Sequence, residues 1–162
     1  MVDYKPSDIL RHSVLDRVIR NDPRRGIDLR IGVDELKTIV RRDIEWLLNT
    51  RQSVPEYADK YSEIPSSVYA YGIPDFTQFS GASTVDKDTV RKAVENALKL
   101  FEPRLLRQSI RVSFVESEGL IGSKLFLKIQ GILHVEPIHE PVSFATSIEL
   151  DSGAVQLTTA DV

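Results

Sequence analysis

The sequence contains no cysteine among its 162 residues. Without thiols there is no disulfide framework and no thiolate metal site, which fits a reducing compartment. No stretch approaches the roughly 18 apolar residues of a membrane-spanning helix. The first residues, MVDYKPSDILRHS, contain charge and proline where a signal peptide has an apolar core. The sequence therefore predicts a cytoplasmic protein with no direct membrane insertion.

Neither sign of charge dominates the chain. It has 21 basic and 24 acidic residues, giving a formal net charge of -3, and this balance does not indicate a nucleic-acid-binding protein. A chain of this length is most simply one domain that buries its own core without a metal or a disulfide. We expect a single domain with an N-terminal docking segment over residues 1–30 and an α+β core over residues 31–162, and a protein as its partner.

A short helix is predicted within SVLDRVIRND. Ser13 is the expected N-cap, and Val14, Leu15 and Val18 form a small apolar face. Because a helix this short is marginal alone, it must dock on something, and another subunit is the candidate.

The strongest helical pattern covers residues 33–48. Apolar residues repeat there with a period of 3.6 and form one broad arc that includes Ile39, Leu36 and Trp46. Asp43 falls inside that arc. Burying a lone carboxylate costs several kcal/mol, so we expect an arginine or backbone donors within reach of Asp43, or a position at the edge of a contact surface.

The remaining pattern predicts a connection, a helix and a sheet. Residues 52–82 are rich in Pro, Ser, Tyr and Gly and predict a long connection whose aromatic residues pack over the core. A second long helix is predicted over residues 85–101, and alternating apolar residues then indicate strands at 110–114, 125–129 and 142–150, with a short fourth at 154–158. Short connections favour a small antiparallel meander of three to four strands packed against two main helices.

The stretch FEPRLL marks the hinge between the second helix and the sheet. Pro103 lacks an N–H and disfavours helical geometry at Glu102, so the helix should end there. Glu102 lies at the negative end of the helix dipole and needs a compensating cation. Arg104 is nearby, and its guanidinium has three candidate partners: Glu102, Asp43 or a neighbouring protein.

The stretch FEPRLLRQSIRV resembles the Glu-Pro-Arg signature of the baseplate wedge family shared by contractile phage tails and type VI secretion systems. SVLDRV, RRDIEWLLNTRQ and YGIPDF are similar, in order and spacing, to stretches of its TssE branch, apart from isoleucine in place of leucine in DIEW and GIPD. The residues that the resemblance carries over as a partner-binding and structural motif are Asp43, Asn49, Thr50, Arg51, Gly72, Pro74, Asp75, Glu102, Pro103 and Arg104.

The resemblance implies a non-enzymatic structural subunit with no cofactor. TssE-like proteins lie in a six-fold cytosolic baseplate with TssF and TssG, near TssK, and help to initiate polymerisation of the contractile sheath built from TssB and TssC. The physics of a meander agrees with that role, because its two edges carry backbone N–H and C=O groups that accept a foreign strand.

An alternative is a cell-wall glycoside hydrolase, since relatives in phage tails have been labelled lysozyme-like. That chemistry needs two carboxylates about 5–9.5 Å apart, one of them with a raised pKa. Glu95 and Glu102 share a helix face, but two helical turns separate them by about 10 Å. No catalytic residue is therefore predicted.

A metal site is also not predicted. HVEPIHEP contains two histidines and two glutamates, but their spacing matches no metal motif with a mechanism behind it. We interpret this stretch as a solvated, proline-bounded connection between strands.

Overall fold

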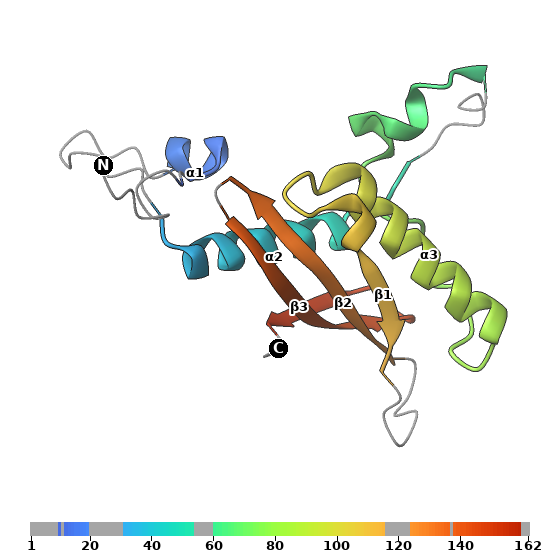
Figure 1. The fold of residues 1–162 in the computed structure, drawn as a ribbon. Coiled ribbons are helices and arrows are strands. Elements are labelled where there is room, and N and C mark those ends of the chain that lie inside the picture. The colour runs from blue at the N-terminus through green and yellow to red at the C-terminus, as the bar shows by residue number, and fades with distance from the viewer. Residues whose placement is uncertain are drawn as a thin grey trace, which may run out of the picture.

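A computed structural model describes residue 10 and residues 12–19, 31–53, 60–115, 124–136 and 138–159. The main helices are α1 (Val14–Ile19), α2 (Val33–Asn49) and α3 (Thr84–Phe101), and the strands are β1 (Arg111–Phe114), β2 (Lys124–Val135), β3 (Ile138–Glu149) and β4 (Val155–Thr159). Three short 3-10 helices are η3 (Ile64–Ser66), η4 (Val68–Ala70) and η5 (Arg107–Ser109). The strands form one antiparallel sheet in the order β1-β2-β3-β4 (Figure 1), which confirms the predicted α+β meander.

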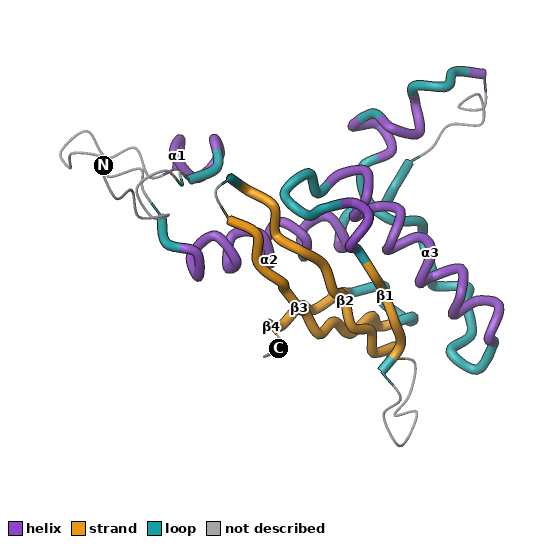
Figure 2. The backbone as a smooth tube through the Cα atoms, in the orientation of Figure 1, coloured by secondary structure: helices purple, strands orange, loops and turns teal. Residues whose placement is uncertain are grey.

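The two central strands of the sheet, β2 and β3, form one long hairpin (Figure 2). Its strands pair from Lys124 with Glu149 to Val135 with Ile138, whereas β1 and β4 pair with only part of it. The interpretation of HVEPIHEP as a connection was wrong, since strands occupy most of that stretch. Its proline at position 141 belongs to the part of β3 that β4 does not reach, and proline is tolerated at such an edge because it needs no ladder N–H.

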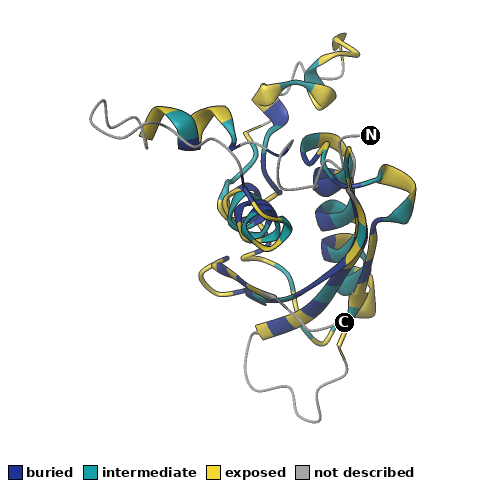
Figure 3. Ribbon diagram, turned by 60° about the vertical axis from the view of Figure 1, so that its left-hand side comes forward, coloured by how far each residue is buried: buried dark blue, intermediate teal, exposed yellow. Residues whose placement is uncertain are grey.

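The core lies between the two long helices and one face of the sheet. Figure 3 shows the buried residues along the inner sides of α2 and α3 and in alternation along the strands. Ile44 of α2, Leu98 of α3 and Ile129 of β2 are completely buried. The exposed positions of this alternation lie on the opposite face of the sheet, which no described helix covers.

Both long helices begin and end close to the predicted positions. Ser83 is the N-cap of α3, and its Oγ accepts the backbone N–H of Asp86 at 3.2 Å. Trp46 departs from the prediction, because it is 48% exposed instead of lying in the apolar arc. The guanidinium of Arg42 lies 4.6 Å from its ring centroid, so the ring has a cationic partner instead of an apolar one.

The apolar face of helix α1 is not docked on the described core, and its docking on another subunit stays a prediction. Its apolar residues Val14, Leu15 and Val18 are exposed, and so is Ile19, whereas Asp16 is only 6% exposed. Ser13 is the N-cap as predicted, with its Oγ accepting the N–H of Asp16 at 3.2 Å. The helix therefore turns its one acidic residue toward the core and its aliphatic face toward solvent.

The connection between α2 and α3 is only partly packed on the core. Phe76 is buried, and Tyr71 and Phe79 pack against the core, as predicted for aromatic residues of this segment. Tyr61 and Tyr69 are exposed on the part containing η3 and η4, which extends away from the body of the fold (Figure 1). The predicted Tyr57 lies outside the described residues. Among the described helices, none is long and apolar enough to cross a membrane.

Candidate functional site

The hinge after α3 continues the edge of the sheet. Glu102 is the C-cap of α3, with its N–H donating to the Leu98 carbonyl at 3.0 Å. Past Pro103, the Arg104 carbonyl accepts the N–H of His134 at 2.8 Å, and the N–H of Leu106 donates to Ile132 at 2.9 Å. These bonds pair the hinge with β2 beyond the end of β1, which fixes the angle between α3 and the sheet.

The hinge charges are paired inside the molecule. Glu102 is 3% exposed, and its Oε1 accepts the backbone N–H of Arg104 at 3.1 Å and Nε of the same residue at 2.7 Å, while its Oε2 accepts Nη2 at 2.6 Å. Nη2 of Arg104 also donates to Oδ2 of Asp43 at 2.9 Å. The predicted cation for Glu102 and the predicted arginine for Asp43 are thus the same residue.

This pairing extends to α1 through Arg42. Nη2 of Arg42 donates to Oδ1 of Asp43 at 2.7 Å, and its Nη1 donates to Oδ1 of Asp16 at 2.6 Å. We call Asp16, Arg42, Asp43, Arg104 and Glu102 the hinge cluster, a chain of alternating charge that joins α1, α2 and the hinge. Asp16 and Arg42 were not predicted as members of this cluster, although an acidic residue three positions after an N-cap serine is a recognisable pattern in the sequence.

The hinge cluster shifts the protonation of its members. Hydrogen bonds from Arg42 and then Ser13 lower the pKa of Asp16 from its ordinary 3.8 to about 2. Burial opposes the charge of Arg104, but the carboxylates of Glu102 and Asp43 more than offset burial, so its pKa is raised. Burial, with these two carboxylates nearby, also raises the pKa of Tyr71. The shifts of Asp16 and Arg104 favour the ionised cluster at neutral pH, and the shift of Tyr71 keeps its phenol neutral.

Acid should release α1 from the hinge cluster. Because the pKa of Asp16 is depressed, its contribution to docking is fully present above pH 3.8 and is lost as the pH falls through about 2. Arg42 stacks on Trp46, the one tryptophan of the chain, so the fluorescence of Trp46 should change over that interval. Asp16→Asn should abolish this transition, whereas Asp34→Asn should leave it; a transition that persists in Asp16→Asn contradicts the assignment.

The YGIPDF segment is hydrogen-bonded to the end of α2. The N–H of Ile73 donates to the Thr50 carbonyl at 3.0 Å, and the N–H of Gln52 donates to the Ile73 carbonyl at 2.9 Å, so Arg51 and Ile73 form a parallel bridge. Gly72 permits this close approach with a φ of 115°. Nη2 of Arg51 donates to the carbonyl of Gly153 in the turn before β4.

The other loop residues remain at the surface. Pro74 and Asp75 are exposed, and Asp75 Oδ1 accepts the N–H of Thr77 at 3.0 Å, a bond that lowers the pKa of Asp75. The structure therefore gathers the predicted residues into two groups, one at the hinge and one at the end of α2.

Side chains of α2 close the outer edge of β4. Nδ2 of Asn49 donates to the Val155 carbonyl at 2.8 Å, and its Oδ1 accepts the Val155 N–H at 3.0 Å. One turn and two turns earlier, Glu45 Oε1 accepts the Leu157 N–H at 3.2 Å, and Arg41 Nη1 donates to the Leu157 carbonyl at 2.8 Å. These three polar side chains replace a neighbouring strand. Of these three residues, only Asn49 was among the predicted motif residues.

The outer edge of β1 is different. The N–H of Val115 donates to Phe126 at 2.9 Å, which sets alternate residues of β1 facing β2 and turns the backbone groups of Val112 and Phe114 outward. Within the described part of the chain, no hydrogen bond occupies these outward groups. As far as the chain is described, the sheet thus has one closed and one open border.

The residues considered for hydrolysis are held in ion pairs. Glu95 contacts Arg91 and Lys99 along α3, and buried Glu102 contacts Arg104. Nothing in this arrangement favours a glycosidase. Across the described residues, no three His, Cys, Asp or Glu side chains gather as candidate metal ligands, and the rings of His134 and His139 stack edge to face with centroids 4.3 Å apart.

Comparison with known families decides the assignment. The sequence model of the family described as baseplate wedge protein gp25 matches residues 34–137, from the start of α2 to the end of β2. The chain belongs to this baseplate wedge family. TssE is the type VI member of the family, so the family predicted from the four motifs is confirmed. Searches of curated proteins and of solved structures found no match.

The family match covers both groups of site residues. Asp43, Gly72 and Glu102 all lie inside it, whereas α1, β3 and β4 lie outside. A baseplate wedge family of this kind assembles with other baseplate proteins, and it is a structural component.

Proposed function

We propose that this wedge subunit acts without catalysis in a type VI secretion baseplate, where it joins TssF and TssG to the first sheath layer of TssB and TssC and helps to initiate sheath polymerisation. It works in the cytoplasm, near TssK, as part of a six-fold ring. The observation that carries the proposal is the contrast between the two borders of the sheet, since β4 is closed by α2 and β1 is open.

The open border suits strand addition. A sheath strand beside β1 would pair its backbone with the outward groups of Val112 and Phe114, and alternate side chains would fix its register. The buried hinge cluster supports this role because it holds α3, α2 and the sheet edge in one geometry. A preorganised edge lowers the ordering cost of binding.

A cysteine placed on β1 should cross-link to a sheath strand. The chain has no native cysteine, so Ser113→Cys, on an exposed position of β1, introduces a unique thiol. Single cysteines are then placed at successive positions along the terminal segments of TssB and TssC. We expect only the positions that face Ser113→Cys in the paired strand to form a disulfide with it. Alternation of reactive positions with a period of two would identify a strand, and gel electrophoresis under non-reducing conditions measures it.

The matched control is Gln156→Cys, an exposed position on β4. Because α2 occupies that border, Gln156→Cys should not give the same periodic cross-links. Equal cross-linking at both positions, or none at Ser113→Cys in an assembled baseplate and sheath, contradicts strand addition at β1.

Helix α1 is the proposed contact with TssF and TssG. Its aliphatic face is uncharged and exposed, while Asp16 anchors the helix on Arg42 from the other side. Val18→Asp should abolish co-purification with TssF and TssG without changing the stability of the isolated protein, because Val18 is 70% exposed. Val85→Asp on α3, where the valine is 73% exposed, is the matched control. Retained binding by Val18→Asp would exclude α1 from the contact.

A further inference from the structure

The face of the sheet opposite the helices has an unusual surface. Register places Val115, Phe126 and Ile132 on this face, and all three are exposed. Polar side chains usually cover the solvent side of an antiparallel sheet. Apolar groups gathered on one exposed face are a common mark of an interaction site.

Part of this face is hollowed. A depression of about 280 Å³ lies across all four strands at the end of the sheet where β1 leaves β2. Its outward-facing lining residues are Val115, Phe126, Ala145, Ser147, Gln156 and Thr158. The volume is below the ~300–1,000 Å³ of typical small-molecule pockets, and it suits one apolar side chain of a neighbouring protein.

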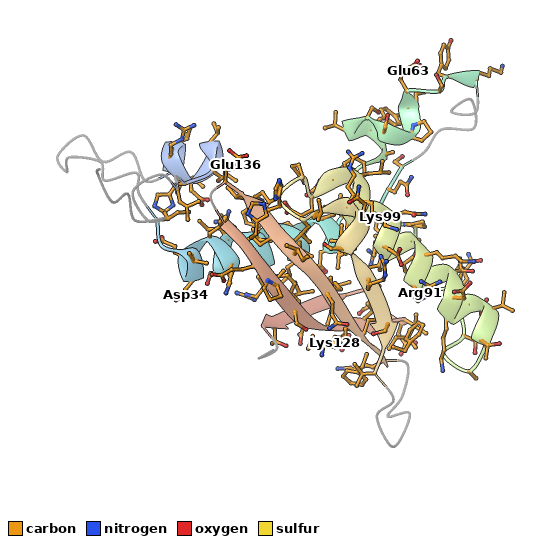
Figure 4. The ribbon with its side chains drawn as sticks, in the orientation of Figure 1. Asp34, Glu63, Arg91, Lys99, Lys128 and Glu136 are labelled. Carbon is orange, nitrogen blue, oxygen red and sulfur yellow. The ribbon has the colours of Figure 1, made fainter. Side chains whose placement is uncertain are left out.

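None of the described lining residues is charged, but two lysines of β2, Lys124 and Lys128, flank Phe126 on this face. Lys128 lies on the same face, opposite Ser113 and Ala145, so neither cross-strand neighbour is a carboxylate (Figure 4). Arg111 also lies there, and its Nη1 donates to the carbonyls of Gln108 and Ile110. Lys124 is paired with Glu149 at 2.6 Å. No described carboxylate forms an ion pair with Lys128 or Arg111.

We infer that this face, called the outer sheet face, docks an acidic segment of a neighbouring baseplate or sheath subunit. One apolar side chain of the segment fills the depression, and flanking carboxylates pair with Lys128 and Arg111. Aromatic and aliphatic anchors in a pocket supply most of the binding energy in such contacts, and the surrounding charges select the partner. This inference rests on the proposed role as a wedge subunit but does not require strand addition at β1.

The test uses tiled peptides that cover the wedge and sheath proteins of the same secretion system. The purified full chain is applied to the array, and each bound peptide is measured again in solution by fluorescence anisotropy. We expect the bound peptides to contain Asp or Glu on both sides of an aromatic or aliphatic residue. A uridine oligonucleotide and a basic peptide of equal length are tested in parallel and should not bind.

Charge reversal separates the outer sheet face from general electrostatics. Lys128→Glu and Phe126→Ser should each weaken peptide binding by about tenfold, whereas Lys128→Arg should retain it. The matched control is Lys92→Glu, at an exposed lysine of α3 outside this face. Circular dichroism confirms that each variant is folded.

Several outcomes overturn the inference: no bound peptide, bound peptides without acidic residues, binding of the oligonucleotide in place of peptides, or equal effects of Lys128→Glu and Lys92→Glu. Ser113 itself lies on the outer sheet face, so only cross-links that recur with a period of two along the partner report strand addition separately from this result. If periodic cross-links form but no peptide binds, only docking at the outer sheet face is rejected. If an acidic peptide binds but no periodic cross-links form, only strand addition at β1 is rejected.

Discussion

Replacement of Arg104 by alanine is expected to lower the free energy of unfolding by about 3–5 kcal/mol. The substitution leaves Glu102, which is 3% exposed, without its guanidinium partner, and it removes one of the two arginines that contact Asp43. Most of the loss comes from stranding a buried carboxylate, since an exposed ion pair contributes only about 0–1 kcal/mol. Urea unfolding at pH 7, followed by circular dichroism, measures the change.

The matched control is Arg91→Ala on α3. Arg91 also contacts two carboxylates, Asp88 and Glu95, but the side chain of Asp88 is 46% exposed and the three lie along one helix surface. We expect a loss of less than about 1 kcal/mol. If Arg104→Ala and Arg91→Ala are equally mild, the hinge cluster is not the structural element that the geometry indicates.

Gly72→Ala is expected to lower the free energy of unfolding by about 2–4 kcal/mol. The φ of Gly72 is 115°, a conformation that residues with a side chain rarely adopt. An added Cβ would also overlap the carbonyl oxygen of Thr50 and lie 2.9 Å from its carbonyl carbon. Relief of either strain breaks the bridge between Arg51 and Ile73. Thermal and urea unfolding measure the loss.

Gly32→Ala provides the comparison for Gly72→Ala. Gly32 is the N-cap of α2, and no atom beyond its chain neighbours lies within 4 Å of a Cβ added there. We expect its effect to stay within about 0.5 kcal/mol of wild type. A destabilisation of Gly32→Ala as large as that of Gly72→Ala would mean that backbone flexibility, and not the contact with Thr50, is responsible.

Periodicity was sufficient to predict most of the fold. The apolar repeat of α2 and the alternation in β1 to β4 reflect local geometry, which a sequence pattern records directly. The hairpin of β2 and β3 was underestimated, because the prolines and histidines of HVEPIHEP suggest a connection and only the incomplete coverage by β4 makes a strand proline acceptable there.

The need for a cation beside Asp43 was predicted, but the set of paired residues was not. An acid inside an apolar arc requires a cation, and this argument correctly demanded one for Asp43. The identity of the partners depends on how α1, α2 and the hinge meet, which no single segment encodes. The orientation of α1 has the same origin: the pairing of Asp16 with Arg42 turns its aliphatic residues outward, where the predicted contact with another subunit stays a prediction.

The polar row of Arg41, Glu45 and Asn49 on α2 limits how copies of this protein can associate with one another. A sheet with two open borders allows copies to stack on both sides, and such stacking grows into fibres. Here the helix occupies one border permanently. Edge-to-edge association between copies would therefore stop at a pair instead of growing into a fibre.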